Sequence, residues 1–164
     1  MTTNTFELNC KGGWVVPSGT VFKRETTFPS FTEFGNYCKF GNYCKFGEGS
    51  EFGNCCKFEG SCEFGSHCEF VEGSEFGNWC KFGNSCNIPI GCIIEGVEMQ
   101  QWTTVSNLDG SGRQVIIILH KEGVKIRAGC FSGTLEDFVE KATSEGKKIY
   151  ASAIPAIANA MKLN

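Results

Sequence analysis

Cysteine and histidine are the residues of this chain that could carry chemistry. The 164 residues include eleven cysteines and two histidines. In a small secreted protein so many cysteines would suggest a disulfide framework. Here eight of them recur in a fixed phase, and no C-x-x-C pair of the kind common in metal sites is present. We therefore expect reduced thiols that act as small hydrophobic side chains, and no bound metal. The eight are Cys38, Cys44, Cys56, Cys62, Cys68, Cys80, Cys86 and Cys92.

Cys130 and His120 are the candidates for a nucleophile and its base. Cys130 comes just before a predicted helix, where the pKa of a thiol can be lowered, and a histidine can activate such a thiol. His120, however, ends one predicted strand, whereas Cys130 follows the far end of the next. His67 has an outward position, where a solvated histidine is favoured over a general base. The turn Asp109–Gly112 is too short for a phosphate loop. We expect no catalytic residue and no cofactor.

The eight cysteines belong to a six-residue repeat that runs from Phe34 to Ile93. It reads FGNYCK FGNYCK FGEGSE FGNCCK FEGSCE FGSHCE FVEGSE FGNWCK FGNSCN IPIGCI. Each unit opens with a bulky apolar residue and has a small residue, Cys or Ser, in its fifth position. This period predicts a β-solenoid in which one unit is a strand and a corner, and three units close one coil. We expect Phe and Cys inside, and a turn at the Gly-Asn pair, because both residues accept positive φ.

The repeat resembles the hexapeptide-repeat family of left-handed β-helices. Its units have an aliphatic residue, a Gly or small or acidic residue, two free positions, a small residue and one more free position. In this chain Phe replaces the aliphatic residue in nearly every unit. The resemblance implies left-handed coils, homotrimers that form through flat sides, and in many members an acyl-CoA-dependent acyltransferase with a catalytic His and an inserted loop. No loop interrupts the ten units, so the acyltransferase is an alternative only.

The chain is expected to have three parts and to be mainly β. Residues 1–15 are interpreted as an N-terminal cap, residues 16–94 as a left-handed parallel β-helix, and residues 95–164 as a small α+β domain. The last part is expected to form a three-stranded antiparallel sheet and two helices. The predicted strands are Trp102–Leu108, Gln114–His120 and Val124–Ala128; the segment Gly129–Gly133 is predicted to break the sheet, Thr134 to cap a helix, and Ile149–Leu163 to form the second helix. The stretch GCFSGTLEDF resembles a cap domain of uncharacterised bacterial and phage repeat proteins.

The outward positions form columns, because equivalent residues of successive coils stack. One column has Tyr43, Ser61 and Trp79, beside a column of Lys45, Glu63 and Lys81. Exposed Tyr and Trp favour protein interfaces, so these six residues are the predicted contact face for a protein partner, with a second copy in a homotrimer as the leading case. A further column stacks three carboxylates, which repel unless something positive meets them. They are Glu33, Glu51 and Glu69.

Charge and hydropathy narrow the classes of function. The formal net charge is −3, and no basic footprint for nucleic acid is visible. No apolar run approaches the ~20 residues of a membrane span, and no signal peptide is apparent. We expect a cytoplasmic protein of a bacterium or a phage, without nucleic-acid or membrane partners, that serves as a non-enzymatic binding or assembly module. Three alternatives stay open: a phage-encoded inhibitor or sequestering protein acting on a host factor, a hexapeptide-family acyltransferase, and a structural virion or filament component.

Overall fold

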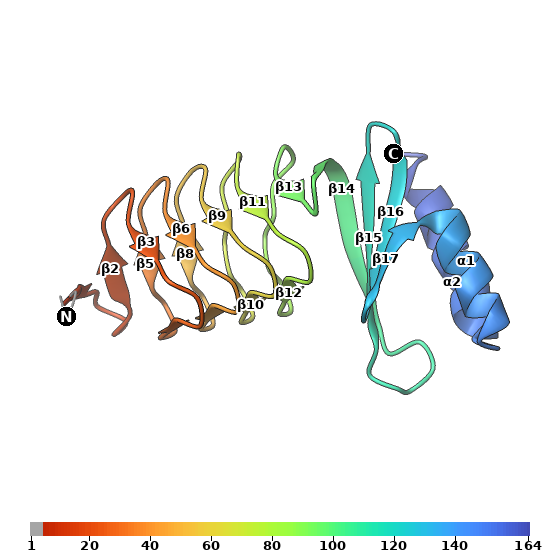
Figure 1. The fold of residues 1–164 in the computed structure, drawn as a ribbon, viewed down its shortest axis with the longest axis horizontal. Coiled ribbons are helices and arrows are strands. Elements are labelled where there is room, and N and C mark those ends of the chain that lie inside the picture. Colours follow the sequence, from red (N-terminus) through yellow and green to blue (C-terminus); the bar gives the residue numbers. More distant parts are fainter. Residues whose placement is uncertain (1–4) are drawn as a thin grey trace. The chain divides into compact units, whose positions relative to one another are not determined.

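The protein is mainly β, with two helices near its C-terminal end (Figure 1). The computed structural model describes residues 5–164, which divide into two compact units, one up to Val97 and the other from Glu98. The first unit is a parallel β-solenoid in which strands of two or three residues recur in successive coils. The repeat therefore forms a solenoid as its period predicts. Neither helix in the described chain has the length and apolar character needed to cross a bilayer.

The strands of the solenoid lie in three columns, and each column forms one flat face. The Glu face contains β1 (Glu7–Leu8), β2 (Trp14–Val16), β5 (Glu33–Phe34) and β8 (Glu51–Phe52), and continues through single bridges at Glu69 and Asn87. The Lys face contains β3 (Val21–Phe22), β6 (Lys39–Phe40), β9 (Lys57–Phe58), β11 (Glu75–Phe76) and β13 (Ile93–Ile94). The ladder face contains β4 (Thr27–Phe28), β7 (Lys45–Phe46), β10 (Glu63–Phe64) and β12 (Lys81–Phe82). Within a column, equivalent residues of successive coils pair in parallel register, except that β1 pairs with β2 in antiparallel fashion.

The corners between the faces are formed differently from the expected Gly-Asn turn. The residue with positive φ is the fourth of each unit, for example Tyr37 at 59° and Tyr43 at 62°. The second-position glycine has another role, because a Cβ on Gly41 would lie 2.6 Å from the backbone N of Arg24 in the preceding coil. Glycine here permits close approach of two coils, and a non-glycine residue takes the left-handed conformation.

The interior of the solenoid consists of the first and fifth residues of the units, as predicted. Phe40 stacks on Phe58 in the next coil with ring centroids 4.9 Å apart, and meets Phe46 of the same coil edge-on at 4.9 Å. These offset-stacked and T-shaped pairs are the arrangements that the aromatic quadrupole favours. The eight cysteines at the fifth position of the repeat, which we call the ladder cysteines, are buried, except Cys86, which is half-buried.

At each end of the solenoid, side chains take the place of a neighbouring coil. At the first end, Phe6 lies 5.6 Å from the ring of Trp14 and 5.9 Å from that of Phe22, so aromatic rings cover the end of the Phe stack. At the last coil, the backbone N–H of Trp79 donates to Oε1 of Glu95 at 3.3 Å, where earlier coils offer a backbone carbonyl. The rings thus cover the first end of the core, and at the last coil Glu95 supplies the acceptor that a further coil would otherwise provide.

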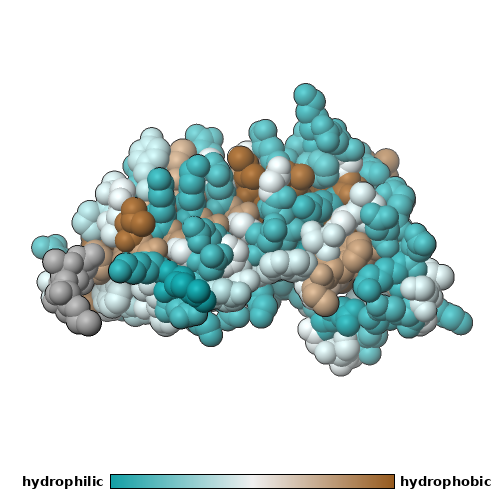
Figure 2. All heavy atoms as spheres, viewed as in Figure 1, coloured by the Kyte–Doolittle hydropathy of each residue, from teal (hydrophilic) through white to brown (hydrophobic). Residues whose placement is uncertain are grey.

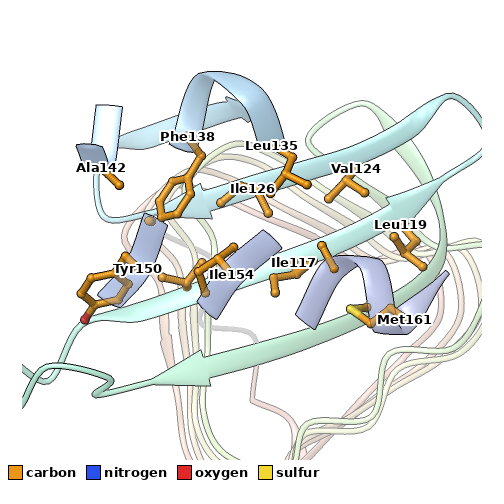
Figure 3. Packing of buried hydrophobic residues seen from close by; sticks show 13 residues of the cluster. Ile117, Leu119, Val124, Ile126, Leu135, Phe138, Ala142, Tyr150, Ile154 and Met161 are labelled. Carbon is orange, nitrogen blue, oxygen red and sulfur yellow. The ribbon is translucent and has the colours of Figure 1, made fainter. Parts of the chain in front are cut away.

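The second unit is a four-stranded antiparallel sheet with both helices on one of its faces. The strands are β14 (Val97–Ser106), β15 (Gln114–His120), β16 (Gly123–Ala128) and β17 (Phe131–Thr134), followed by α1 (Leu135–Ser144) and α2 (Lys148–Met161). They pair in the order β14-β15-β16-β17. Phe138, Tyr150 and Ile154 of the helices pack on alternate residues of β15 and β16 (Figure 3).

The sheet has a fourth strand, β17, in addition to the three that the sequence predicts. The segment Gly129–Gly133 was expected to break the sheet, yet only its first residues turn, and Phe131 pairs with Ala128 in a tight hairpin. Gly129 has a φ of 60°, which glycine adopts at little cost in conformational energy, and so it allows this turn. The cap of α1 follows the prediction: the hydroxyl of Thr134 accepts a hydrogen bond from the N–H of Asp137 at 3.1 Å.

Candidate functional site

The predicted contact residues Tyr43, Ser61 and Trp79 lie along a corner of the solenoid and not on a flat face. All three have positive φ, between 58° and 65°, and each belongs to a turn. We call this row the aromatic edge. Tyr43 is 52% exposed and Trp79 is 38% exposed, with the smaller Ser61 between them. His67 lies on a different corner for the same reason. These residues lie at a corner because the turn begins directly after the strand and includes the fourth residue of the unit.

Backbone hydrogen bonds between coils hold the aromatic edge in place. The N–H of Tyr43 donates to the carbonyl of Gly60 at 3.1 Å, and that of Ser61 donates to the carbonyl of Asn78 at 2.8 Å. The guanidinium of Arg24 lies 5.7 Å from the centroid of the Tyr43 ring, within the range of a cation–π contact. The two aromatic side chains therefore project from a backbone that does not need to become ordered on binding, which lowers the entropic cost of a contact.

The predicted Lys-Glu-Lys column forms on the ladder face, next to the aromatic edge. Glu63 lies between its two partners: its carboxylate is 3.9 Å from Nζ of Lys45 and 3.3 Å from Nζ of Lys81. All three side chains are largely solvated, so these pairs contribute little to stability. Their main consequence is that the ladder face is nearly neutral by itself. Figure 2 shows this kind of surface on the coils, with hydrophilic side chains in rows and single apolar ones among them.

The ladder thiols hydrogen-bond to the backbone of the preceding coil. Sγ of Cys62 lies 3.5 Å from the carbonyl of Gly41, and every ladder cysteine makes the equivalent contact. The hydrogen bond to Cys62, together with burial, raises the pKa of the Cys44 thiol. For Cys62, a hydrogen bond to Cys44 lowers the pKa, but the bond to Cys80 and burial outweigh it and raise the pKa to about 12. Burial raises the pKa of Cys92 to about 11. The thiols of Cys44, Cys62 and Cys92 are therefore protonated near neutral pH and are poor nucleophiles. Hydrogen bonds with Cys56 and Cys68 instead lower the pKa of Cys38 and of Cys86, respectively, to about 7.

The strand register keeps Cys130 and His120 apart. His120 pairs with Gly123 at one end of the β15–β16 hairpin, whereas Val115 pairs with Ala128 at the other end, two residues before Cys130. A strand of this length spans about 20 Å, so the two side chains do not form a nucleophile and base. Among residues 5–164, no three His, Cys, Asp or Glu side chains form a group that could hold a metal ion.

Cys130 instead borders a small pocket in the second unit, which the sequence did not indicate. The pocket has a volume of about 160 Å³. Its polar lining comes from Arg113, Cys130, Lys141, Glu145, Lys147 and Tyr150. Hydrogen bonds from Lys141 and Lys147 lower the pKa of Glu145 to about 2. These residues are far apart in the sequence and match no motif, so nothing in the one-dimensional pattern could have grouped them.

Comparison with known proteins identified no relative of this chain. No protein-family model matches the chain, and neither the curated proteins nor the solved structures include one that is significantly similar to it.

Proposed function

We propose that this protein is a non-enzymatic binding and assembly module, and that the aromatic edge is its contact with another protein chain, in the first place a second copy. The observation that supports the proposal is the exposure of Tyr43 and Trp79 on a backbone fixed by coil-to-coil hydrogen bonds. Large aromatic side chains in such positions often contribute about 2 kcal/mol or more of binding free energy each. The small side chain of Ser61 between them leaves room for a partner's side chain.

The proposal includes several finer features taken from the resemblance to hexapeptide-repeat proteins. The coils wind left-handed, residues 1–15 act as a cap that prevents strand addition, and the assembly is a homotrimer. The column Lys45, Glu63 and Lys81 forms the polar rim of the contact, because it lies beside the aromatic edge and remains solvated. The protein works in the cytoplasm, where the ladder thiols stay reduced.

The test is replacement of both aromatics by serine in the full chain. Ser61 and Ser85 already occupy the same position of the repeat with φ of 58° and 57°, so serine is compatible with the local backbone. We expect Y43S/W79S to fold with an unchanged circular dichroism spectrum and to have the mass of a monomer by light scattering, whereas the natural chain has a larger mass. Removal of two anchors should weaken the contact by roughly 4 kcal/mol in total.

A matched control is Tyr37→Ser, which removes an equally exposed ring from a different corner. Tyr37 is 61% exposed and has φ of 59°, so its local geometry is the same as that of Tyr43. We expect this variant to keep the mass of the natural chain. An unchanged mass for Y43S/W79S, or equal dissociation of Y37S, would show that the aromatic edge is not the contact between copies.

A further inference from the structure

The charges of the solenoid are distributed unequally over its three faces. On the Glu face, Glu33 is in register with Glu51, and Glu51 with Glu69, so three exposed carboxylates follow one another at the spacing of the coils. Every lysine between residues 34 and 93 lies on one of the other two faces. Since adjacent strands are about 4.8 Å apart, like charges in register repel each other.

The carboxylates of the Glu face are not neutralised within the chain. In the part of the chain that the structure describes, Glu51 and Glu69 form no ion pair, and Glu33 receives only a hydrogen bond from Nδ2 of Asn9 at 2.9 Å. The ladder face is the contrast, because its alternating charges satisfy one another. The Glu face therefore lacks the positive partner that the ladder face contains.

The Lys face has the complementary arrangement. Lys39 and Lys57 lie in register on neighbouring strands, at the same coil-to-coil spacing as the carboxylates. Lys57 contacts Glu75 at 3.1 Å, but Lys39 forms no ion pair within residues 5–164. The face is also hollowed: Lys39, Lys57 and Glu75 border a trough of about 480 Å³, which Gly41 and Gly77 also line.

We propose that the Glu face of one copy docks on the Lys face of a second copy, with the columns of carboxylates and ammonium groups paired across the contact. The occupant is a second copy because both columns have the same period, so two successive coils that present carboxylates in one chain can meet the two successive coils that present Lys39 and Lys57 in the other. The exposed Val21 and the half-buried Ile93 stand at the two ends of the Lys face and supply apolar area at the ends of the contact. This inference rests on the proposed self-association and names surfaces for it other than the aromatic edge.

Two different surfaces meet in this contact, so it is heterologous. A heterologous contact between identical chains closes a ring of at least three copies or continues as an open chain; it does not make a two-fold dimer. The homotrimer of the proposed function is the smallest ring that it allows. Because the pairs are solvent-exposed charges, the association is also expected to weaken as salt rises.

The experiment is a charge swap on the full chain, measured by sedimentation velocity. The variant K39E/K57E makes the Lys face acidic, and the variant E51K/E69K makes the Glu face basic. We expect each variant alone to associate at least about tenfold more weakly than the natural chain, because like charges then face each other. The combined variant K39E/K57E/E51K/E69K should recover the assembly, since its acidic Lys face then meets the basic Glu face of the next copy in every contact.

Two controls keep the result specific. Lys121→Glu changes an exposed lysine of the second unit and should leave the mass unchanged, and thermal unfolding followed by circular dichroism should show that all variants are folded. The natural chain should also shift toward monomer between about 0.05 M and about 1 M salt, where the screening length falls to ~3 Å.

The outcomes separate this inference from the proposed function. Dissociation of Y43S/W79S together with unchanged assembly of both charge variants overturns the pairing of the two faces and leaves the aromatic edge standing. Dissociation of the two charge variants with recovery in the combined variant supports the pairing, even if Y43S/W79S still associates, in which case the aromatic edge is the part that fails. A combined variant that stays monomeric, or a natural chain that is monomeric at low salt, overturns the pairing.

Discussion

Individual cysteines in this protein differ in environment far more than their common place in the repeat suggests. Cys10 and Cys130 are exposed, Cys55 and Cys86 are half-buried, and the other seven are buried. Ser50 and Ser74 occupy the same inward position as the ladder cysteines and donate to the carbonyl three residues earlier in their own unit. Cysteine is the larger and less polar choice, and it reaches the preceding coil instead.

Thiol labelling should reproduce these classes. In the native protein at pH 8, we expect iodoacetamide to modify Cys10 and Cys130 quickly and Cys55 and Cys86 slowly, because the thiolate is the reactive form and access is limited. Cys62 and Cys92, with pKa values of about 12 and about 11, should react only after unfolding. Peptide mass spectrometry assigns the sites, and labelling in denaturant should reach all eleven. Rapid modification of Cys62 in the folded protein would contradict the buried ladder.

At the scale of the strand and its corner, the close approach of successive coils explains the choice of glycine. The second position of the unit contacts the backbone of the coil before it, as the short distances at Gly35, Gly47 and Gly65 show. Glu59, Val71 and Pro89 occupy the same position in three units, so a side chain is accommodated there in part of the solenoid. Glycine is therefore favoured at this position because it lets successive coils pack closely, and not because the turn requires its backbone conformation.

Gly41→Ala tests this explanation. Its Cβ would lie 2.6 Å from the N of Arg24, which is closer than a non-bonded contact permits, so we expect the variant to be destabilised by roughly 1–3 kcal/mol. Urea unfolding followed by fluorescence measures the free energy of unfolding. Asn54→Ala is the control, because this residue is exposed at the next position of a unit, and it should change stability by less than about 0.5 kcal/mol. Equal stability of the two variants would show that the coils are not in close contact at Gly41.

For the whole molecule, the important property is that each unit has its own hydrophobic core. The solenoid is filled by the Phe column and the thiols, whereas the second unit is organised around buried residues such as Ile117 and Ile154 (Figure 3). Units with separate cores need not unfold in one step.

Hydrogen exchange should distinguish the two cores. Phe58→Ala removes a ring that is 3% exposed and should cost about 3–5 kcal/mol, and Ile154→Ala removes a side chain that is 0% exposed and should cost about 2–5 kcal/mol. We expect the first variant to accelerate exchange mainly within residues 5–97 and the second mainly within residues 98–164, as measured by mass spectrometry. Acceleration of both units to the same extent by either variant would indicate a single cooperative unit.

The six-residue period was sufficient to predict the solenoid, its inward Phe and Cys and its stacked columns. These properties depend on side-chain alternation within a unit, which is local and repeats unchanged. The cap of α1 was also predictable, since Thr134 and Asp137 are three residues apart and interact within one turn. The same reasoning placed Tyr43, Ser61 and Trp79 on a flat face, whereas they lie in turns at a corner; that these residues and the neighbouring Lys45, Glu63 and Lys81 form a contact stays a prediction.

Tertiary structure decided where the chain turns. The left-handed residue of each unit is stabilised by a hydrogen bond to the next coil, such as that from Tyr43 to Gly60, and no interaction within the unit indicates it. This shift made Tyr43, Ser61 and Trp79 an edge. β17 and the pocket beside Cys130 likewise depend on contacts between residues distant in sequence, which a local pattern does not contain.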